Sequence, residues 1–183
     1  MNKTPLKFRK LQMDELNRKS IDEMDSVQKI PLVIVLDNIR SLHNVGSVFR
    51  SADAFTIEKI YLCGITAQPP HREIQKTALG ATESVSWEYR EHTLEAVAEL
   101  KEDNYCLVAV EQTMNSAEPK EFVNSSVKYA VVLGNEVDGV SQDALELCDR
   151  CLEIPQDGAK HSLNISIAAG IVMWHFYNLF SKA

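Results

Sequence analysis

The sequence predicts an α/β domain with a mostly parallel sheet flanked by helices. Short apolar runs rich in β-branched residues recur along the chain, which is typical of strands buried on both faces of a parallel sheet. Stretches with helical spacing of apolar residues separate these runs, and this alternation favours the α/β class. With 45% hydrophobic and 25% charged residues among 183, the chain has the composition of a folded domain with one core.

Six strands are predicted within the domain, which we assign to residues 30–183. The first is the apolar run Pro31–Leu36, and it follows a polar N-terminal extension at residues 1–29 that we expect to be helical. The other predicted strands are residues 59–63, 84–89, 105–110, 129–133 and 151–154.

Helices are predicted between the strands. One follows the first strand, and a second is expected at residues 94–101. The apolar positions that define the face of the first helix are Val45, Val48, Phe49 and Ala52.

The last predicted helix extends from about Leu163 to Phe180. Its first half, Ile165–Trp174, is apolar on nearly every side, and such a helix needs burial all round. A domain of this size covers only part of that surface, so we expect a second subunit to cover the rest. A homodimer is the expected assembly, because two-fold pairs are the commonest oligomers.

The sequence also argues against membrane and metal-binding classes. The longest nearly unbroken apolar run has ten residues, whereas a membrane-spanning helix needs about 20. The N-terminal residues lack the apolar stretch of a signal peptide, so we expect a cytoplasmic protein. Cys148 and Cys151 form a CxxC pair, but Cys63 and Cys106 have no close Cys or His partner, so we expect reduced thiols and no metal.

Charge is distributed unevenly along the chain. The net charge of −7 argues against a surface coated in positive potential for nucleic acid. Residues 1–20 nevertheless contain six basic and two acidic residues. This segment suits either a solvated helix or a short arm that contacts phosphates.

Three polar segments follow predicted strands, where ligands bind in open α/β sheets. The first, residues 36–55, contains Asn44, Gly46 and Arg50. Taken alone, Asn44 suits a helix N-cap, and Arg50 suits a surface residue with a partly covered stem. Gly46 permits close approach of a backbone or a ligand.

The second and third segments have similar alternatives. Residues 131–141 suit a turn before a helix that Ser141 caps, with Glu136 as a solvated carboxylate. In residues 154–170, helix capping by Ser162 explains one polar residue but not Asn164 within an otherwise apolar helix. Neither GxGxxG, GxxxxGK[ST] nor G-x-S-x-G occurs, which argues against Rossmann, P-loop and hydrolase sites.

Together the three segments resemble the motifs of the SpoU (TrmH-like) family of RNA 2′-O-ribose methyltransferases, in the SPOUT class. The first is similar to Asn-x-Gly-x-x-x-Arg, at residues 44–50. The second is similar to Leu-Gly-Asn-Glu-x-x-Gly, at residues 133–139, and the third to Ile-Pro-x-x-Gly-x-x-x-Ser-Leu-Asn-x-Ser, at residues 154–166. Gln156 stands where the family often has Met, and the residues after Arg50 also differ from the common pattern.

The resemblance implies a C-terminal trefoil knot that contains the second and third segments. It also implies S-adenosylmethionine as the cofactor, with backbone groups of Leu133, Gly134, Ile154 and Leu163 holding it. Family members are dimers with the active site at the subunit interface, which agrees with the homodimer expected from the last helix.

The resemblance implies a catalytic set of Arg50, Asn44, Glu136, Ser162 and Asn164. The family assigns the role of general base to the residue at the position of Arg50. Because arginine stays protonated in proteins, we expect Arg50 instead to stabilise the 2′-oxyanion and to hold the adjacent phosphate. Asn44 would orient the ribose or Arg50, and Ser162 and Asn164 would complete the hydrogen bonds. Glu136 would shape its loop or balance a positive charge.

Two alternatives remain open for the function. One is a catalytically silent RNA-binding relative, and the other is a knotted methyltransferase that acts on a base or on a substrate other than RNA. We expect tRNA rather than rRNA as the substrate, because residues 1–29 and a dimer groove must supply the phosphate contacts.

Overall fold

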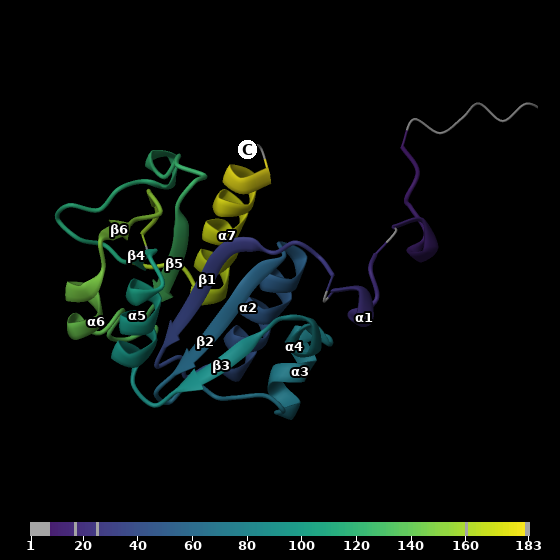
Figure 1. Ribbon diagram of the computed structural model, residues 1–183, viewed down its shortest axis with the longest axis horizontal. Coiled ribbons are helices and arrows are strands. Elements are labelled where there is room, and N and C mark those ends of the chain that lie inside the picture. Colours follow the sequence, from purple (N-terminus) through teal and green to yellow (C-terminus); the bar gives the residue numbers. More distant parts are fainter. Residues whose placement is uncertain (1–7, 17, 25, 160, 182–183) are drawn as a thin grey trace, which may run out of the picture.

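The computed structural model describes residues 8–16, 18–24, 26–159 and 161–181, which build a six-stranded sheet flanked by helices (Figure 1). The strands lie in the order β3-β2-β1-β5-β4-β6, and every pairing is parallel. This arrangement confirms the predicted fold class. The strands are Ile30–Asp37 (β1), Ile57–Cys63 (β2), Trp87–Arg90 (β3), Tyr105–Val110 (β4), Lys128–Leu133 (β5) and Arg150–Leu152 (β6).

Helices cover both faces of the sheet. Two 3-10 turns, Met13–Leu16 (η1) and Pro119–Glu121 (η2), occur in connecting segments. Within the described ranges, no helix is long and apolar enough to cross a membrane. The α-helices in those ranges are Ile21–Met24 (α1), Leu42–Ala54 (α2), Arg72–Ala78 (α3), Ala81–Ser84 (α4), Thr93–Glu102 (α5), Gln142–Leu147 (α6) and Ile165–Ser181 (α7).

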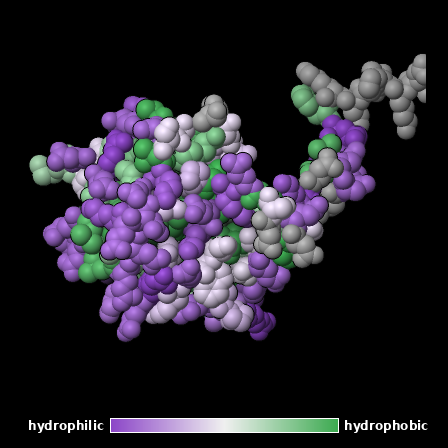
Figure 2. All heavy atoms as spheres, viewed as in Figure 1, coloured by the Kyte–Doolittle hydropathy of each residue, from purple (hydrophilic) through white to green (hydrophobic). Residues whose placement is uncertain are grey.

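Alternation along the strands sends side chains into two apolar layers. From β1, Leu32, Ile34 and Leu36 pack with α2 and α7, whereas Val33 and Val35 pack with α5 and α6 on the other face. β1 is apolar at each of these positions because both of its faces are buried. The outer surface visible in Figure 2 is mainly hydrophilic, as expected when helices cover both faces of the sheet.

Most predicted elements are confirmed, and the differences lie at their ends. The strand predicted at residues 84–89 is confirmed only in part, because β3 begins at Trp87 and the preceding Ala81–Ser84 form α4. The last helix begins at Ile165, two residues after its predicted start. The buried face predicted for α2 is confirmed.

The described part of the N-terminal extension contains little helix. Helical residues in it are confined to η1 and α1, which are four residues long each, and residues 1–7, 17 and 25 lie outside the described part. The extension leaves the domain beside α4 (Figure 1). Only these two short segments of the helical extension expected at residues 1–29 are helical in the described residues, and the extension and the domain boundary stay predictions.

Parallel pairing brings the carboxyl ends of the strands to one edge of the sheet. β1, β5, β4 and β6 are consecutive neighbours, so the polar segments after β1, β5 and β6 begin close together. Asp37 at the end of β1 is buried and joins two of the neighbouring elements. It accepts hydrogen bonds from Thr93 Oγ1 at the start of α5, at 2.5 Å, and from the Ser141 backbone N–H, at 2.8 Å.

Candidate active site

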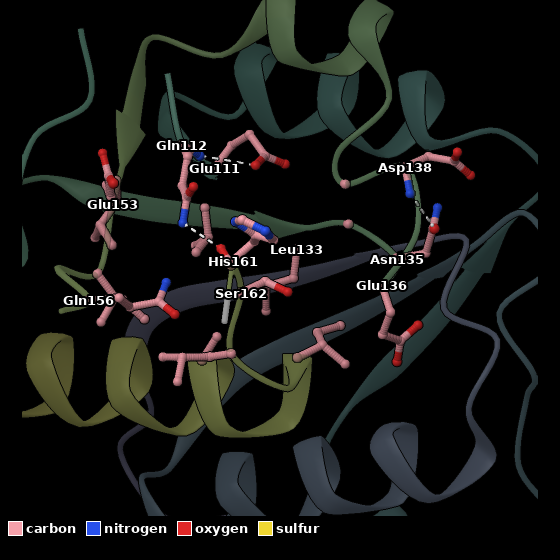
Figure 3. A pocket seen from close by; sticks show the side chains of 18 of the residues that line it. Glu111, Gln112, Leu133, Asn135, Glu136, Asp138, Glu153, Gln156, His161 and Ser162 are labelled. Carbon is pink, nitrogen blue, oxygen red and sulfur yellow. Dashed lines mark hydrogen bonds between the residues drawn. The ribbon is translucent and has the colours of Figure 1, made fainter. Parts of the chain in front are cut away.

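A cavity of about 430 Å³ lies at this edge, between the segments after β4, β5 and β6 and the start of α7 (Figure 3). Its volume is in the range of small-molecule sites. The residues predicted to hold a cofactor, Leu133, Gly134, Ile154 and Leu163, all line it. They come from two strand ends and from the loop before α7, so the fold gathers these separate segments around one cavity.

Two glycines allow the loop after β5 to fold back on itself. A Cβ on Gly134 would overlap the carbonyl group of Gly139, which leaves no space for a side chain. Gly139 has a φ of +69°, and a Cβ there would overlap the carboxylate of Glu111. Two backbone hydrogen bonds between Asn135 and Gly139, of 3.2 and 3.0 Å, close the loop, which forms one wall of the cavity.

Glu111 and Gln112, directly after β4, brace both loops around the cavity. Glu111 Oε2 accepts a hydrogen bond from the Val140 backbone N–H at 3.2 Å, behind the loop after β5. Gln112 Nε2 donates to the carbonyl oxygen of His161 at 3.0 Å, in the segment before α7 (Figure 3). Neither residue is among the sequence-predicted site residues, although both follow a buried strand as the three polar segments do.

The cavity lining is acidic. No Lys or Arg occurs among the lining residues that the structure describes, and apolar side chains alternate with the polar ones. Such a lining suits a ligand that has an apolar part and a positive charge, and it disfavours a phosphate-bearing ligand, which needs cationic partners. The carboxylates belong to Glu111, Glu136, Asp138 and Glu153.

Asn44, Glu136 and Asn164 come from three separate segments and form one hydrogen-bonded chain. Asn44 Nδ2 donates to Glu136 Oε1 at 2.5 Å, and Asn164 Nδ2 donates to Asn44 Oδ1 at 3.2 Å. Ser41 caps α2, because its Oγ accepts a hydrogen bond from the Asn44 backbone N–H at 3.3 Å. The capping role considered for Asn44 is therefore wrong, and its amide links the other two segments.

Asn164 caps α7 in place of Ser162. Its Oδ1 accepts hydrogen bonds from the Ser166 backbone N–H at 2.9 Å and from Ser166 Oγ at 2.7 Å. The capping predicted for Ser162 is wrong, and the two polar residues at the start of this apolar helix bond to each other. Ser162 is exposed and lines the cavity. Ser141 precedes α6, but its hydroxyl makes no capping hydrogen bond.

Arg50 lies apart from this network. It is exposed on α2 and does not line the cavity, and its side chain makes no hydrogen bond or ion pair within the described part of the chain. Its neighbour Ser51 faces α7, since Ser51 Oγ lies 3.9 Å from the position of a Cβ on Gly170. α2 thus packs on α7, and α7 has an uncovered apolar face. The exposed residues of that face are Ile167, Ile171 and Trp174, with 55%, 39% and 53% of their surface exposed.

The cysteines do not form part of a metal-binding group in the described residues. All four are free, and no group of three or more His, Cys, Asp or Glu residues in that part of the chain could hold a metal ion. Burial raises the pKa of Cys63 and of Cys148 to about 12, so both thiols are protonated at neutral pH.

The chain is similar in sequence to known proteins. The sequence model of the SpoU rRNA Methylase family matches residues 31–174. The 23S rRNA (guanosine-2′-O-)-methyltransferase RlmB of Vibrio vulnificus is 30% identical over 162 residues, which are 87% of this chain and 64% of that protein. This chain thus spans less than two thirds of the length of that relative.

Solved structures share the fold. A TrmH/SpoU tRNA modifying enzyme of A. aeolicus has a TM-score of 0.79 and 23% identity, with 88% of this chain and 83% of that chain covered. The SpoU methyltransferase AviRb of Streptomyces viridochromogenes, in complex with the cofactor AdoMet, has a TM-score of 0.77 and 22% identity. The matched part covers 90% of this chain and 66% of AviRb.

Proposed function

This chain belongs to the SpoU rRNA methylase family, and we propose that it transfers a methyl group from S-adenosylmethionine to a ribose 2′-hydroxyl of structured RNA. One observation carries the proposal. Asn44, Glu136 and Asn164, one from each motif, are hydrogen-bonded to one another beside the cavity. The silent RNA-binding alternative is less well supported, because a binding protein does not need this polar set together with a small-molecule cavity.

S-adenosylmethionine, when bound, supplies a methyl group on a positively charged sulfur. The cavity fits this cofactor in volume, in its mixed apolar and polar lining, and in its acidic charge. We assign the grip on the cofactor to Leu133, Gly134, Ile154 and Leu163, and the bracing of their loops to Glu111. The carboxylates around the cavity favour a cation there by opposite charge.

The hydrogen-bonded chain of Asn44, Glu136 and Asn164 positions the ribose. Because Asn44 Nδ2 donates to Glu136 and Asn44 Oδ1 accepts from Asn164, both ends of its amide are held in place. A side chain that is already fixed loses little freedom when the substrate binds, and such positioning contributes to the rate. Ser162, exposed at the cavity, supplies a hydroxyl for the nucleotide or the cofactor.

Arg50 acts in this proposal as a cation and not as a base. A guanidinium is a cation in proteins generally, and that of Arg50 can bind a phosphate through two parallel N–H groups and can stabilise the developing 2′-oxyanion. Since Arg50 has no partner in the described part of the chain, its donors are available for RNA. The motif-one pair of Asn44 and Arg50 favours the ribose over a base as the methylated group.

A homodimer and the C-terminal knot are further parts of the proposal. The exposed apolar face of α7 beside α2 is the surface through which two chains would pair, and burial there would supply the favourable free energy. Arg50 is exposed on α2, which packs on α7, so in this proposal pairing brings it to the interface, where the resemblance puts the active site of the family.

The RNA class is open between two candidates. The Vibrio vulnificus relative is named as a 23S rRNA enzyme, whereas a structural neighbour is named as a tRNA modifying enzyme. The preference for tRNA stays a prediction, as does the cytoplasmic location. Both RNA classes therefore belong in the test of activity.

The test is transfer of labelled methyl from S-adenosylmethionine into unmodified tRNA and rRNA transcripts. We expect incorporation into at least one of the two, and its loss in Arg50→Ala with cofactor binding retained. A protein that does not bind S-adenosylmethionine would contradict the proposal and favour the silent RNA-binding relative.

A further inference from the structure

The net charge of the domain is distributed unevenly along its sequence. Residues 38–82 contain five basic and three acidic residues, whereas residues 83–183 contain seven basic and 17 acidic residues. The first part includes α2, α3 and α4, which pack together on one side of the molecule (Figure 1). A polyanion meets the least repulsion on that side.

Five basic or imidazole side chains on α2, α3 and the loops before them are exposed and form what we name the α2–α3 basic surface. Glu73 contacts three of the side chains of this surface. Its carboxylate lies 3.0 Å from His43 Nε2 and 2.7 Å from Lys76 Nζ, and its backbone N–H donates to His71 Nδ1 at 3.2 Å. The members of the surface are Arg40, His43, His71, Arg72 and Lys76.

The cations of this surface outnumber the carboxylates that face them. The hydrogen bond from Lys76, and then that from His43, lower the pKa of Glu73, so this carboxylate is ionised. Arg40 lies 3.8 Å from Asp138, but both side chains are more than half exposed, and such a contact contributes little. Arg72 has no hydrogen bond or ion pair within the described ranges, so its donors are available.

This surface is rigidly joined to the candidate active site. α3 packs closely on α2, because a Cβ on Gly46 would overlap Thr77 and the Ile74 carbonyl, and Thr77 Oγ1 donates to the His43 carbonyl at 3.0 Å. Arg40 lies four residues before Asn44, and its partner Asp138 lines the cavity. An RNA strand on this surface therefore passes beside the cavity.

We propose that the α2–α3 basic surface binds phosphate groups of the RNA strand that flanks the target ribose. The cavity itself offers no described Lys or Arg for these phosphates, so the contacts must come from a neighbouring surface. Phosphate contacts fix the position of a nucleic acid, and the base and ribose contacts then select the site. This inference rests on the proposed function, since it assigns the path of the same RNA.

The test is RNA binding by the full chain at several KCl concentrations, without turnover. The probes are in-vitro transcribed tRNA and 23S rRNA, each labelled with a fluorophore. The binding constant K falls as salt rises, and each lost phosphate contact reduces the magnitude of the slope of log K against log salt by about 0.7 on single strands. We expect the triple variant Arg40→Ala/Arg72→Ala/Lys76→Ala to lose about 2 from that slope and to bind about 100-fold more weakly at about 0.1 M salt.

Lys120→Ala is the matched control for Lys76→Ala. Both lysines are exposed and each is paired with a nearby glutamate, at 2.7 Å for Lys76 with Glu73 and 2.8 Å for Lys120 with Glu118. We expect Lys76→Ala to reduce the magnitude of the salt slope and Lys120→Ala to leave it unchanged. Arg72→Lys keeps the charge and should retain most of the affinity, which a folding defect would not allow.

The outcomes separate this inference from the proposed function. An unchanged slope in the triple variant, equal losses in Lys76→Ala and Lys120→Ala, or no binding of either RNA by the wild type would overturn the inference. Reduced slope in the triple variant with normal S-adenosylmethionine binding supports it. If the wild type transfers no methyl group but the slope difference persists, the surface stands and the methyltransferase proposal fails.

Discussion

Replacing Gly134 with alanine tests how the wall of the cavity is built. The added Cβ would overlap the carbonyl group of Gly139 and the backbone nitrogen of Val140, so the loop would have to open. Opening breaks two backbone hydrogen bonds between Asn135 and Gly139, of 3.2 and 3.0 Å. Because each such bond contributes about 0.5–1.5 kcal/mol net, we expect the free energy of unfolding to fall by about 1–3 kcal/mol.

Urea unfolding measures the stability loss, and calorimetric titration measures S-adenosylmethionine binding. We expect Gly134→Ala to weaken cofactor binding by about ten-fold or more, which corresponds to about 1.4 kcal/mol. Gly158→Ala is the matched control, because a Cβ there meets nothing within 4 Å, and it should change the stability by less than about 0.5 kcal/mol. Wild-type stability and wild-type affinity in Gly134→Ala would refute the reasoning.

Three further changes test separate parts of the account. Both carboxylate oxygens of Glu111 accept hydrogen bonds from backbone N–H groups. Glu111→Gln should therefore raise the KM for S-adenosylmethionine about 2- to 10-fold and leave kcat unchanged. An unchanged KM would contradict the bracing role. Asn44→Asp places a second carboxylate against Glu136 and should lower kcat about 100-fold at saturating cofactor, and wild-type turnover would exclude a positioning role. Burial raises the pKa of Cys63 from 9.0 to about 12, so the unfolded state binds fewer protons between these values. The stability from this thiol is complete below about pH 9 and is lost toward pH 12, by about 1.4 kcal/mol per pH unit. Urea titrations at about pH 8 and about pH 10 should show the fall. Cys63→Ala should show a smaller fall and not its absence, because the pKa of Cys148 is raised in the same way, and a fall as large as that of the wild type would contradict the assignment to Cys63.

The sheet could be predicted because its signal is local. Strands such as β1 are buried on both faces, and burial on both faces makes every position apolar. The start of β3 is harder to predict, because Ser84 is the last residue of the short helix α4. That helix follows Gly80, whose backbone is in the left-handed region with a φ of +91°. Nothing in the alternation of residues 84–89 distinguishes that helical turn from the first half of a strand.

The candidate site could be predicted only where residues follow a known pattern. Leu133, Gly134, Ile154 and Leu163 line the cavity, but their contact with one another depends on the strand order. Glu111 carried a usable signal, because it follows the buried strand β4 directly.

Helix caps were mispredicted for a related reason. Ser41 and Asn164 cap their helices, whereas Asn44 and Ser162 suit the same role by residue type. The difference depends on where the helix begins within three residues, which the sequence pattern does not define. The capping by Ser41 leaves the amide of Asn44 for its contacts with Glu136 and Asn164, and these contacts arise only in the folded chain.

The most direct test of the central claim identifies the methylated atom. Unmodified tRNA and rRNA are incubated with the protein and labelled S-adenosylmethionine, digested to nucleosides, and analysed by mass spectrometry. The account predicts a 2′-O-methylnucleoside that is absent when Arg50→Ala replaces the wild type. A nucleoside methylated on its base, or a 2′-O-methyl product that persists in Arg50→Ala, would contradict it.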